Sequence, residues 1–116
     1  MMEWIYSFFD NRTFGAARSQ QWEALSRAYR EEQPLCEFGM HKPTLLNPLN
    51  THHIQVFHEH PELELIKSNW INVCRFHHYA HCHFFNWSDS NSNVREEASL
   101  FTEELNAHRK NAKISQ

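Results

Sequence analysis

Histidine is concentrated in one part of this chain. The protein has 116 residues and 10 histidines, and all but one of the histidines lie between residues 41 and 83. The segment "NTHHIQVFHEHPELEL", residues 50–65, holds two adjacent histidines and two more shortly after them. Imidazole is the commonest metal ligand and titrates at about pH 6.5, so this density indicates a metal site as well as a packed core.

Two short strands are predicted where the histidines are densest. Residues 51–57, "THHIQVF", and residues 69–74, "NWINVC", are rich in β-branched and aromatic side chains and are separated by a polar loop. Side chains alternate between the two faces of a strand. The second strand therefore gives one face to Ile71 and Val73 and the other to Trp70 and Asn72.

Three helices are predicted around these strands, over residues 19–33, 75–82 and 93–108. The first begins with Ser19 as N-cap and ends before Pro34. In the last, Asn93 and Glu96 resemble a capping box, and an apolar stripe follows at Val94, Ala98, Phe101 and Leu105. Trp22, Trp87 and this stripe are assigned to the core. The fold class is α+β with a very small sheet.

Composition is that of an ordinary globular domain, with 41% hydrophobic and 22% charged residues. The net charge of −3 weighs mildly against nucleic acid as a partner. Three cysteines offer no disulfide framework and favour a reducing compartment or metal ligation. We expect an aromatic docking segment at 1–17, one domain at 18–110 and a tail at 111–116. No membrane segment or signal peptide is predicted.

Nine short blocks, collinear from residue 18 to about residue 98, resemble the HNH endonuclease family, in particular the single-domain type common in phage genomes. The blocks are Arg18-Ser19-Gln20-Gln21-Trp22, Pro34-Leu35-Cys36, Thr51-His52-His53-Ile54, Pro61 to Leu65, Asn69-Trp70-Ile71, Val73-Cys74, His77-His78, Cys82-His83 and Asn86-Trp87. The resemblance implies a ββα-metal fold, in which a two-stranded hairpin and a helix hold one divalent ion.

Roles follow from the resemblance by position. His52 and His78 are implied to be metal ligands, His53 the general base, and Asn69 the residue that orients the base. Strand alternation agrees with separate roles for His52 and His53, since their side chains point to opposite faces. A carbonyl of Asn69, from its side chain or main chain, would then accept a hydrogen bond from the idle nitrogen of His53. Ligands rich in imidazole suit Zn²⁺, Ni²⁺ or Mn²⁺ better than Mg²⁺.

The third ligand is open. The resemblance implies His83, but residues five apart on an ideal α-helix are rotated by about 140°. His83 can therefore join His78 only if the helix breaks near residue 81 or 82. His81 and Cys82 lie on the better helical face, and Cys82 is the main alternative ligand.

A second, structural zinc site is also implied by the resemblance, and here its cysteine pairs are incomplete. Cys36, Cys74 and His77 could hold zinc if His41 supplied a fourth ligand. The alternative is that this place is filled by Phe38 and Phe76.

The sequence thus predicts a metal-dependent DNA endonuclease that hydrolyses phosphodiester bonds, acting on DNA in the cytoplasm of a bacterial or phage-infected cell. The first alternative is a catalytically degenerate module of the same fold that binds metal or DNA. The second is an interaction protein of a phage assembly, for example in packaging, which would dock through its N-terminal aromatic segment.

Overall fold

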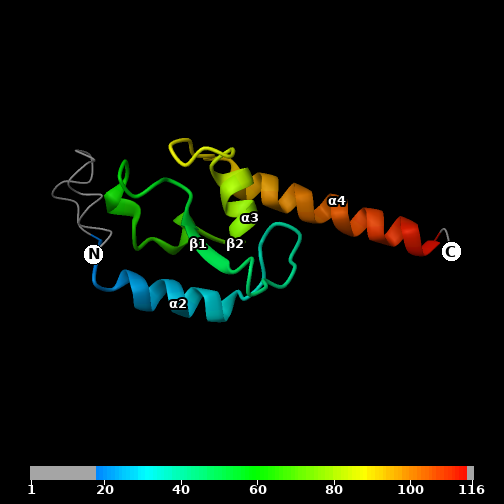
Figure 1. Cartoon of the computed structure of the whole chain (residues 1–116), viewed down its shortest axis with the longest axis horizontal. Helices are drawn as coiled ribbons and strands as arrows, with labels where there is room; N and C mark the ends of the chain where they lie inside the picture. Colours follow the sequence, from blue (N-terminus) through cyan, green and yellow to red (C-terminus); the bar gives the residue numbers. More distant parts are fainter. Residues whose placement is uncertain (1–17, 115–116) are drawn as a thin grey trace.

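The structure, a computed structural model, describes residues 18–114 (Figure 1). The expected docking segment at 1–17 lies outside the described residues. In chain order the elements are helix α2 (Trp22–Glu32), strand β1 (Leu49–His53), the 3-10 turns η1 (Pro61–Leu63) and η2 (Lys67–Asn69), strand β2 (Trp70–Cys74), helix α3 (Arg75–His77), the π-helix η3 (His78–Cys82) and helix α4 (Val94–Ile114).

The sheet has two antiparallel strands, which confirms the α+β class. Leu49 pairs with Cys74 at one end and His53 with Trp70 at the other. The first strand was predicted too far along the chain, because it ends at His53. Beyond this point the backbone N–H of Ile54 donates to the carbonyl of Asn69 at 2.8 Å. This bond turns the chain into the loop that leads to β2.

Helix α2 covers one face of the sheet, while α3, η3 and the start of α4 lie on the other face (Figure 1). On the α2 side, the Trp70 ring packs 5.3 Å from Trp22, and the Asn72 side chain donates to the carbonyls of Tyr29 and Gln33. On the opposite side the core consists of buried apolar residues that include Ile71, Val73, Val94 and Ala98. The predicted alternation along β2 is confirmed.

The helix termini differ from the predicted caps. Helix α2 begins at Trp22 with Gln21 as its N-cap, so Ser19 lies two positions before the cap. The Ser19 hydroxyl accepts from the Gln21 N–H at 3.1 Å. Before α4, Asn91 forms the capping contacts that were expected of the Asn93–Glu96 pair. Its Oδ1 accepts from the Asn93 N–H, and its Nδ2 donates to the Glu97 carboxylate.

Helix α4 is longer than predicted. It runs without interruption past the expected boundary at residues 110–111 and projects away from the body (Figure 1). Val94 and Ala98 are buried, whereas Phe101 is 36% exposed, so the predicted apolar stripe belongs to the core only in its first half. Within residues 18–114, no helix has the length and apolar character needed to cross a bilayer.

Candidate metal centres and general base

Three histidines converge on the face of the sheet opposite α2. His52 comes from β1, His78 opens η3, and His83 directly follows η3. Nδ1 of His52 lies 3.0 Å from Nε2 of His78, and Nε2 of His83 lies 3.2 Å from the same atom. We call these three residues the histidine triad. Their nitrogens could hold one metal ion.

The π-helix explains how His83 reaches His78. A π-helix closes hydrogen bonds between residues five apart, so it places residues at this spacing on one side. The predicted helix over residues 75–82 is confirmed, but it is α-helical only to His77 and a π-helix from His78 to Cys82. It ends at Cys82, within the region where a break was expected, and His83 follows with a non-helical backbone. The chain reverses after the triad, at Phe84 and Phe85, whose φ angles are +51° and +61°.

Cys82, the alternative ligand, does not join the triad. It is fully buried in the core with Cys36 and Val73, and burial raises the pKa of its thiol. His81, also on the expected helical face, stacks on Phe38 with ring centroids 4.5 Å apart. All three cysteines of the chain fall within the described residues and are free.

The hydrogen-bonding roles within the triad favour a cation. Nδ1 of His83 donates to the carbonyl of Asp89 at 2.7 Å, so its Nε2 carries a lone pair toward His78. Nε2 of His78 has one proton at most in the neutral ring and cannot satisfy both neighbouring nitrogens well. A tetrahedral ion with bonds of about 2.0–2.1 Å separates its nitrogen ligands by about 3.3 Å, close to the spacing found here.

Burial keeps the triad neutral, as metal ligands must be. His52 is 4% exposed, and burial, followed by its neighbours His78 and His83, lowers its pKa to about 2. Burial likewise lowers the pKa of His78 to about 4 and lowers that of His83. Among the described side chains, Nε2 of His52, the ring nitrogen that does not face His78, is buried without a hydrogen-bond partner. The residues present fit a divalent ion bound by imidazole.

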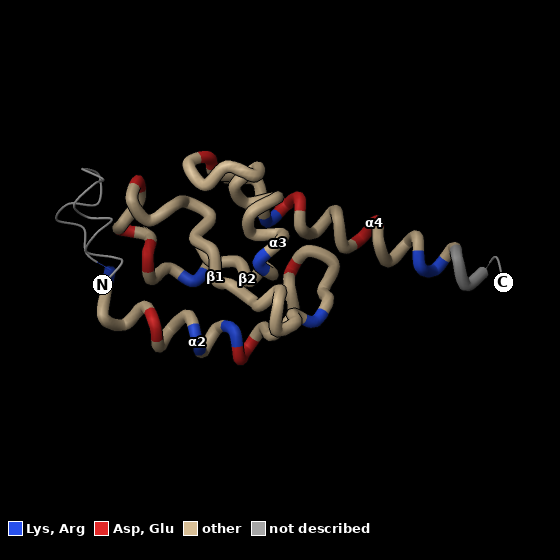
Figure 2. Tube along the Cα trace, viewed as in Figure 1, with Lys and Arg blue, Asp and Glu red and all other residues tan. Residues whose placement is uncertain are grey.

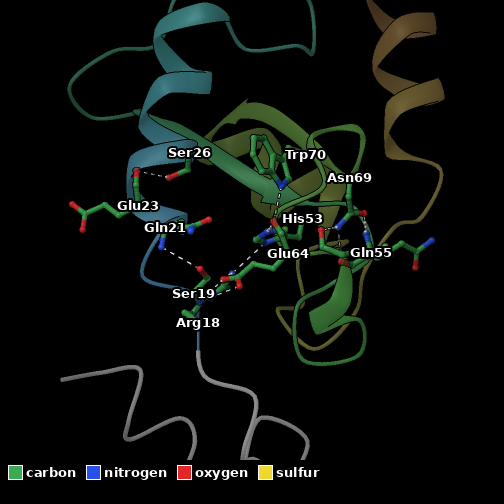
Figure 3. Close-up of polar contacts among 11 residues, drawn as sticks. Arg18, Ser19, Gln21, Glu23, Ser26, His53, Gln55, Glu64, Asn69 and Trp70 are labelled. Atoms are coloured by element: carbon green, nitrogen blue, oxygen red, sulfur yellow. Dashed lines mark hydrogen bonds and ion pairs between the residues drawn. The ribbon is translucent and has the colours of Figure 1, made fainter.

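His53 lies on the other face of the sheet, beneath Trp22, with ring centroids 4.2 Å apart. Its Nε2–H donates to the main-chain carbonyl of Glu64 at 2.9 Å, as Figure 3 shows. Nδ1 therefore carries the lone pair, and Nη1 of Arg18 lies 3.3 Å from it. Burial lowers the pKa of His53 to about 4, with the Glu64 carbonyl opposing and Arg18 contributing to the shift, so the ring is neutral at pH 7.

Asn69 does not make the expected contact with His53. Its Oδ1 accepts from the Gln55 N–H at 2.8 Å, and its Nδ2 donates to the carbonyls of Gln55 and Leu63 at 3.1 and 3.4 Å (Figure 3). These bonds close the loop that carries Glu64. Asn69 thus positions His53 through the loop, and the acceptor for His53 is the carbonyl of Glu64.

The sequence did not predict that Arg18 and Glu64 contact His53. Arg18 and Glu64 form an ion pair at 3.8 Å, and both carboxylate oxygens of Glu64 accept from the Ser19 N–H. Both residues stand in sequence blocks that were likened to the HNH pattern, and that likeness is the signal that could have marked them. The Glu64 carbonyl also accepts from the Trp70 indole N–H at 2.8 Å.

The second predicted metal group also comes together. Cys36, His41, Cys74 and His77 place one ligand atom each within 4.8 Å of the others. Sγ of Cys36 lies 3.3 Å from Nδ1 of His77, which lies 3.5 Å from Nε2 of His41. These four residues, here called the cysteine–histidine group, could hold a second ion.

A tight turn brings His41 back to Cys36. The N–H of Cys36 donates to the carbonyl of His41 at 2.9 Å, and Gly39 within the turn has a φ of +88°. A Cβ at residue 39 would lie 3.1 Å from both Leu105 and Phe101 of α4. Residue 39 is therefore restricted to glycine, and the turn places His41 beside Cys36.

The aromatic alternative for this place is not observed. Phe38 is buried, but it packs beside the group, with its ring 5.4 Å from that of His77. Phe76 is 56% exposed. Trp87, predicted to lie in the core, is 58% exposed, and its ring lies 4.8 Å from that of His83.

Comparisons with known proteins add no family or neighbour: no family model, no curated protein and no solved structure matches the chain. The fold and the two groups of ligands therefore rest on the structure itself.

Proposed function

We propose that this protein is a metal-dependent DNA endonuclease of the HNH type, with a ββα-metal core formed by β1, β2 and the α3–η3 segment. One observation carries the proposal. His52, His78 and His83 bring three nitrogens together on one face of β1, while the next residue, His53, is kept neutral by burial on the other face, where its hydrogen bond to the Glu64 carbonyl fixes the tautomer.

His53 has the features of a general base. Donation from Nε2 to the Glu64 carbonyl fixes the tautomer and leaves Nδ1 to take a proton from water. Arg18 now lies against Nδ1 with a side chain 40% exposed. We propose that its guanidinium moves onto a phosphate oxygen when DNA binds, which frees Nδ1 and neutralises part of the phosphate charge.

The triad would bind the ion through three neutral imidazoles, a set that suits Zn²⁺, Ni²⁺ or Mn²⁺ better than Mg²⁺. A site with three protein ligands leaves a fourth position for a phosphate oxygen. When bound, the ion would stabilise negative charge on the scissile phosphate and on the leaving oxygen.

The cysteine–histidine group would hold a structural zinc. Its four ligands join the turn at Cys36 and His41 to the end of β2 at Cys74 and the end of α3 at His77. A closed set of four ligands with no open position is typical of structural zinc. Such a site would fix the direction of α3 and hence the position of His78.

The test is cleavage of supercoiled plasmid with Mn²⁺, Ni²⁺, Mg²⁺ or Zn²⁺, each against a chelated control. Wild type should nick the plasmid, and His53→Ala should not, although its metal content stays unchanged. His58→Ala serves as a matched histidine in the following loop and should retain activity. A fully active His53→Ala protein would refute the assignment of the base.

One observation favours a second candidate, a module that binds metal and DNA without cleaving. His53 is only 6% exposed, and its free nitrogen is covered by Arg18. This candidate predicts that the wild-type protein binds DNA in a metal-dependent manner but cleaves DNA with none of the four metals. The same plasmid assay, followed by a binding assay, separates the two functions.

A further inference from the structure

An exposed tryptophan lies directly against the histidine triad. The ring of Trp87 is 4.8 Å from that of His83 and 5.3 Å from that of His78, and 58% of the residue is exposed. Such a ring contributes little to the core. It lies against two of the three triad rings and is open to solvent.

Further rings continue away from the triad. Tyr79 lies 4.9 Å from Trp87, Phe85 lies 5.5 Å from Tyr79, and Phe76 lies 6.4 Å from Phe85. Phe85 and Phe76 are 59% and 56% exposed. We call Trp87, Tyr79, Phe85 and Phe76 the aromatic row. It is a continuous, partly solvated surface that begins at the candidate metal centre.

Phe85 is held in an unfavourable conformation to take its place in the row. A φ of +61° is strained for a bulky residue, and Phe84 before it has the same kind of φ. The loop is held by bonds from Nδ1 of His83 to the Asp89 carbonyl and from the Asn91 N–H to the Cys82 carbonyl. Glycine or asparagine would adopt this backbone at lower cost. Neither the backbone nor burial thus explains a phenylalanine at residue 85.

We propose that the aromatic row stacks the unpaired bases of single-stranded DNA and so directs single strands to the triad. This inference rests on the proposed nuclease function and names its substrate. Exposed aromatic rings bind single strands because every base has a flat apolar face, which a duplex hides within its own stack. A strand lying on the row would pass the triad at Trp87. Arg75, which is exposed and precedes Phe76 in sequence, offers a cation for its phosphates.

The position of the row favours a nucleic acid over a protein partner. Trp87 contacts two of the three triad residues, so a protein seated on it would also cover the open position of the ion. A strand stacked on the same rings would instead bring a phosphate to that position.

The test measures binding separately from cleavage, in metal-loaded full-length protein carrying His53→Ala. The probes are a fluorescein-labelled oligothymidine and a duplex of the same length, followed by anisotropy. In this background Phe85→Gly removes one ring and also relieves the strained φ, so it does not destabilise the fold through the backbone. Phe76→Ala removes a second ring. Leu46→Ala, an exposed apolar residue on a different loop, is the control.

We expect the single strand to bind at least tenfold more tightly than the duplex and to quench tryptophan fluorescence. Each ring variant should weaken binding of the single strand about tenfold, with metal content and duplex binding unchanged. Leu46→Ala should bind as the parent does. Equal affinity for duplex and single strand, or ring variants that bind normally, would overturn the proposal. Self-association that Phe85→Gly abolishes would also overturn it, since the rings would then serve a second copy of the chain.

The outcome also separates this inference from the nuclease assignment. Binding of single strands through the rings, without cleavage of either plasmid or single-stranded DNA by wild type under any metal, would retain the aromatic row and remove the nuclease. The opposite result is metal-dependent plasmid cleavage that the ring variants leave unchanged, together with no preference for single strands. That result would retain the nuclease and remove the aromatic row as a binding site.

Discussion

Asn69→Ala should uncouple metal binding from catalysis. Asn69 is buried, and its side chain makes two well-formed bonds to the backbone of Gln55, at 2.8 and 3.1 Å, and a longer one of 3.4 Å to Leu63. Each well-formed bond contributes about 1 kcal/mol. Gln55 is exposed, so water can satisfy its freed groups, and we expect a loss of about 2 kcal/mol in the free energy of unfolding.

The loss of activity should exceed what unfolding explains. The loop that Asn69 closes carries the Glu64 carbonyl, the acceptor that fixes the tautomer of His53. Cleavage by the folded fraction of Asn69→Ala should therefore fall at least tenfold, whereas one ion still binds the triad, which lies on the other face of the sheet. Asn69→Asp, which keeps the acceptor for the Gln55 N–H, should be intermediate.

The assays are urea denaturation followed by fluorescence, metal content after dialysis, and plasmid nicking. Asn50→Ala is the matched control, because among the described residues the Asn50 side chain bonds only to the carbonyl of its neighbour Leu49. Normal stability together with normal nicking in Asn69→Ala would refute this account of the loop. Loss of the ion from the triad would show that the two faces are not independent.

Three further predictions concern the rest of the fold. Gly39→Ala should lower the free energy of unfolding by about 2 kcal/mol in a denaturation experiment, because residue 39 has a φ of +88° and a Cβ there would have contacts of 3.1 Å. Adding Phe101→Leu to this variant should recover part of the loss. Cys36→Ser should remove one of two bound zinc ions and leave metal-dependent nicking measurable, which atomic absorption and the plasmid assay check together. Burial and then Glu37 raise the pKa of Tyr29 from 10 to about 12. The contribution of Tyr29 to stability is therefore complete below pH 10 and is lost as the pH rises toward 12. In Tyr29→Phe the denaturation midpoint should depend less on pH across that range.

Residues whose position depends on local pattern were predictable. Strand alternation separated His52 from His53, and it separated Ile71 and Val73 from Trp70. Helix geometry likewise indicated that His83 could not join His78 on an ideal α-helix. A π-helix cannot be recognised from composition, because it depends on how the whole segment packs against the sheet.

Other features of the site are not encoded in side-chain type. The acceptors for His53 and His83 are main-chain carbonyls, those of Glu64 and Asp89, and every residue in a sequence offers one. Trp87 was assigned to the core because an apolar side chain is more often buried. Only the reversal of the chain at residues 84–85 exposes it.

Charge alone is a weak guide to the partner here. Lys and Arg positions are interspersed with Asp and Glu positions along the described part of the chain, as Figure 2 shows. The proposal for DNA therefore depends on the triad, on Arg18 and on the aromatic row, and not on the net charge of −3.

The most direct test of the central claim is X-ray absorption at the zinc edge. The full chain with Cys36→Ser and Cys74→Ser, loaded with one equivalent of zinc, leaves the triad as the predicted site. We predict three imidazole nitrogens at about 2.0 Å, with an oxygen in the fourth position and no sulfur. His78→Ala in the same chain should lose this signal. A first shell that contains sulfur, or a zinc site that persists without His78, would contradict the account.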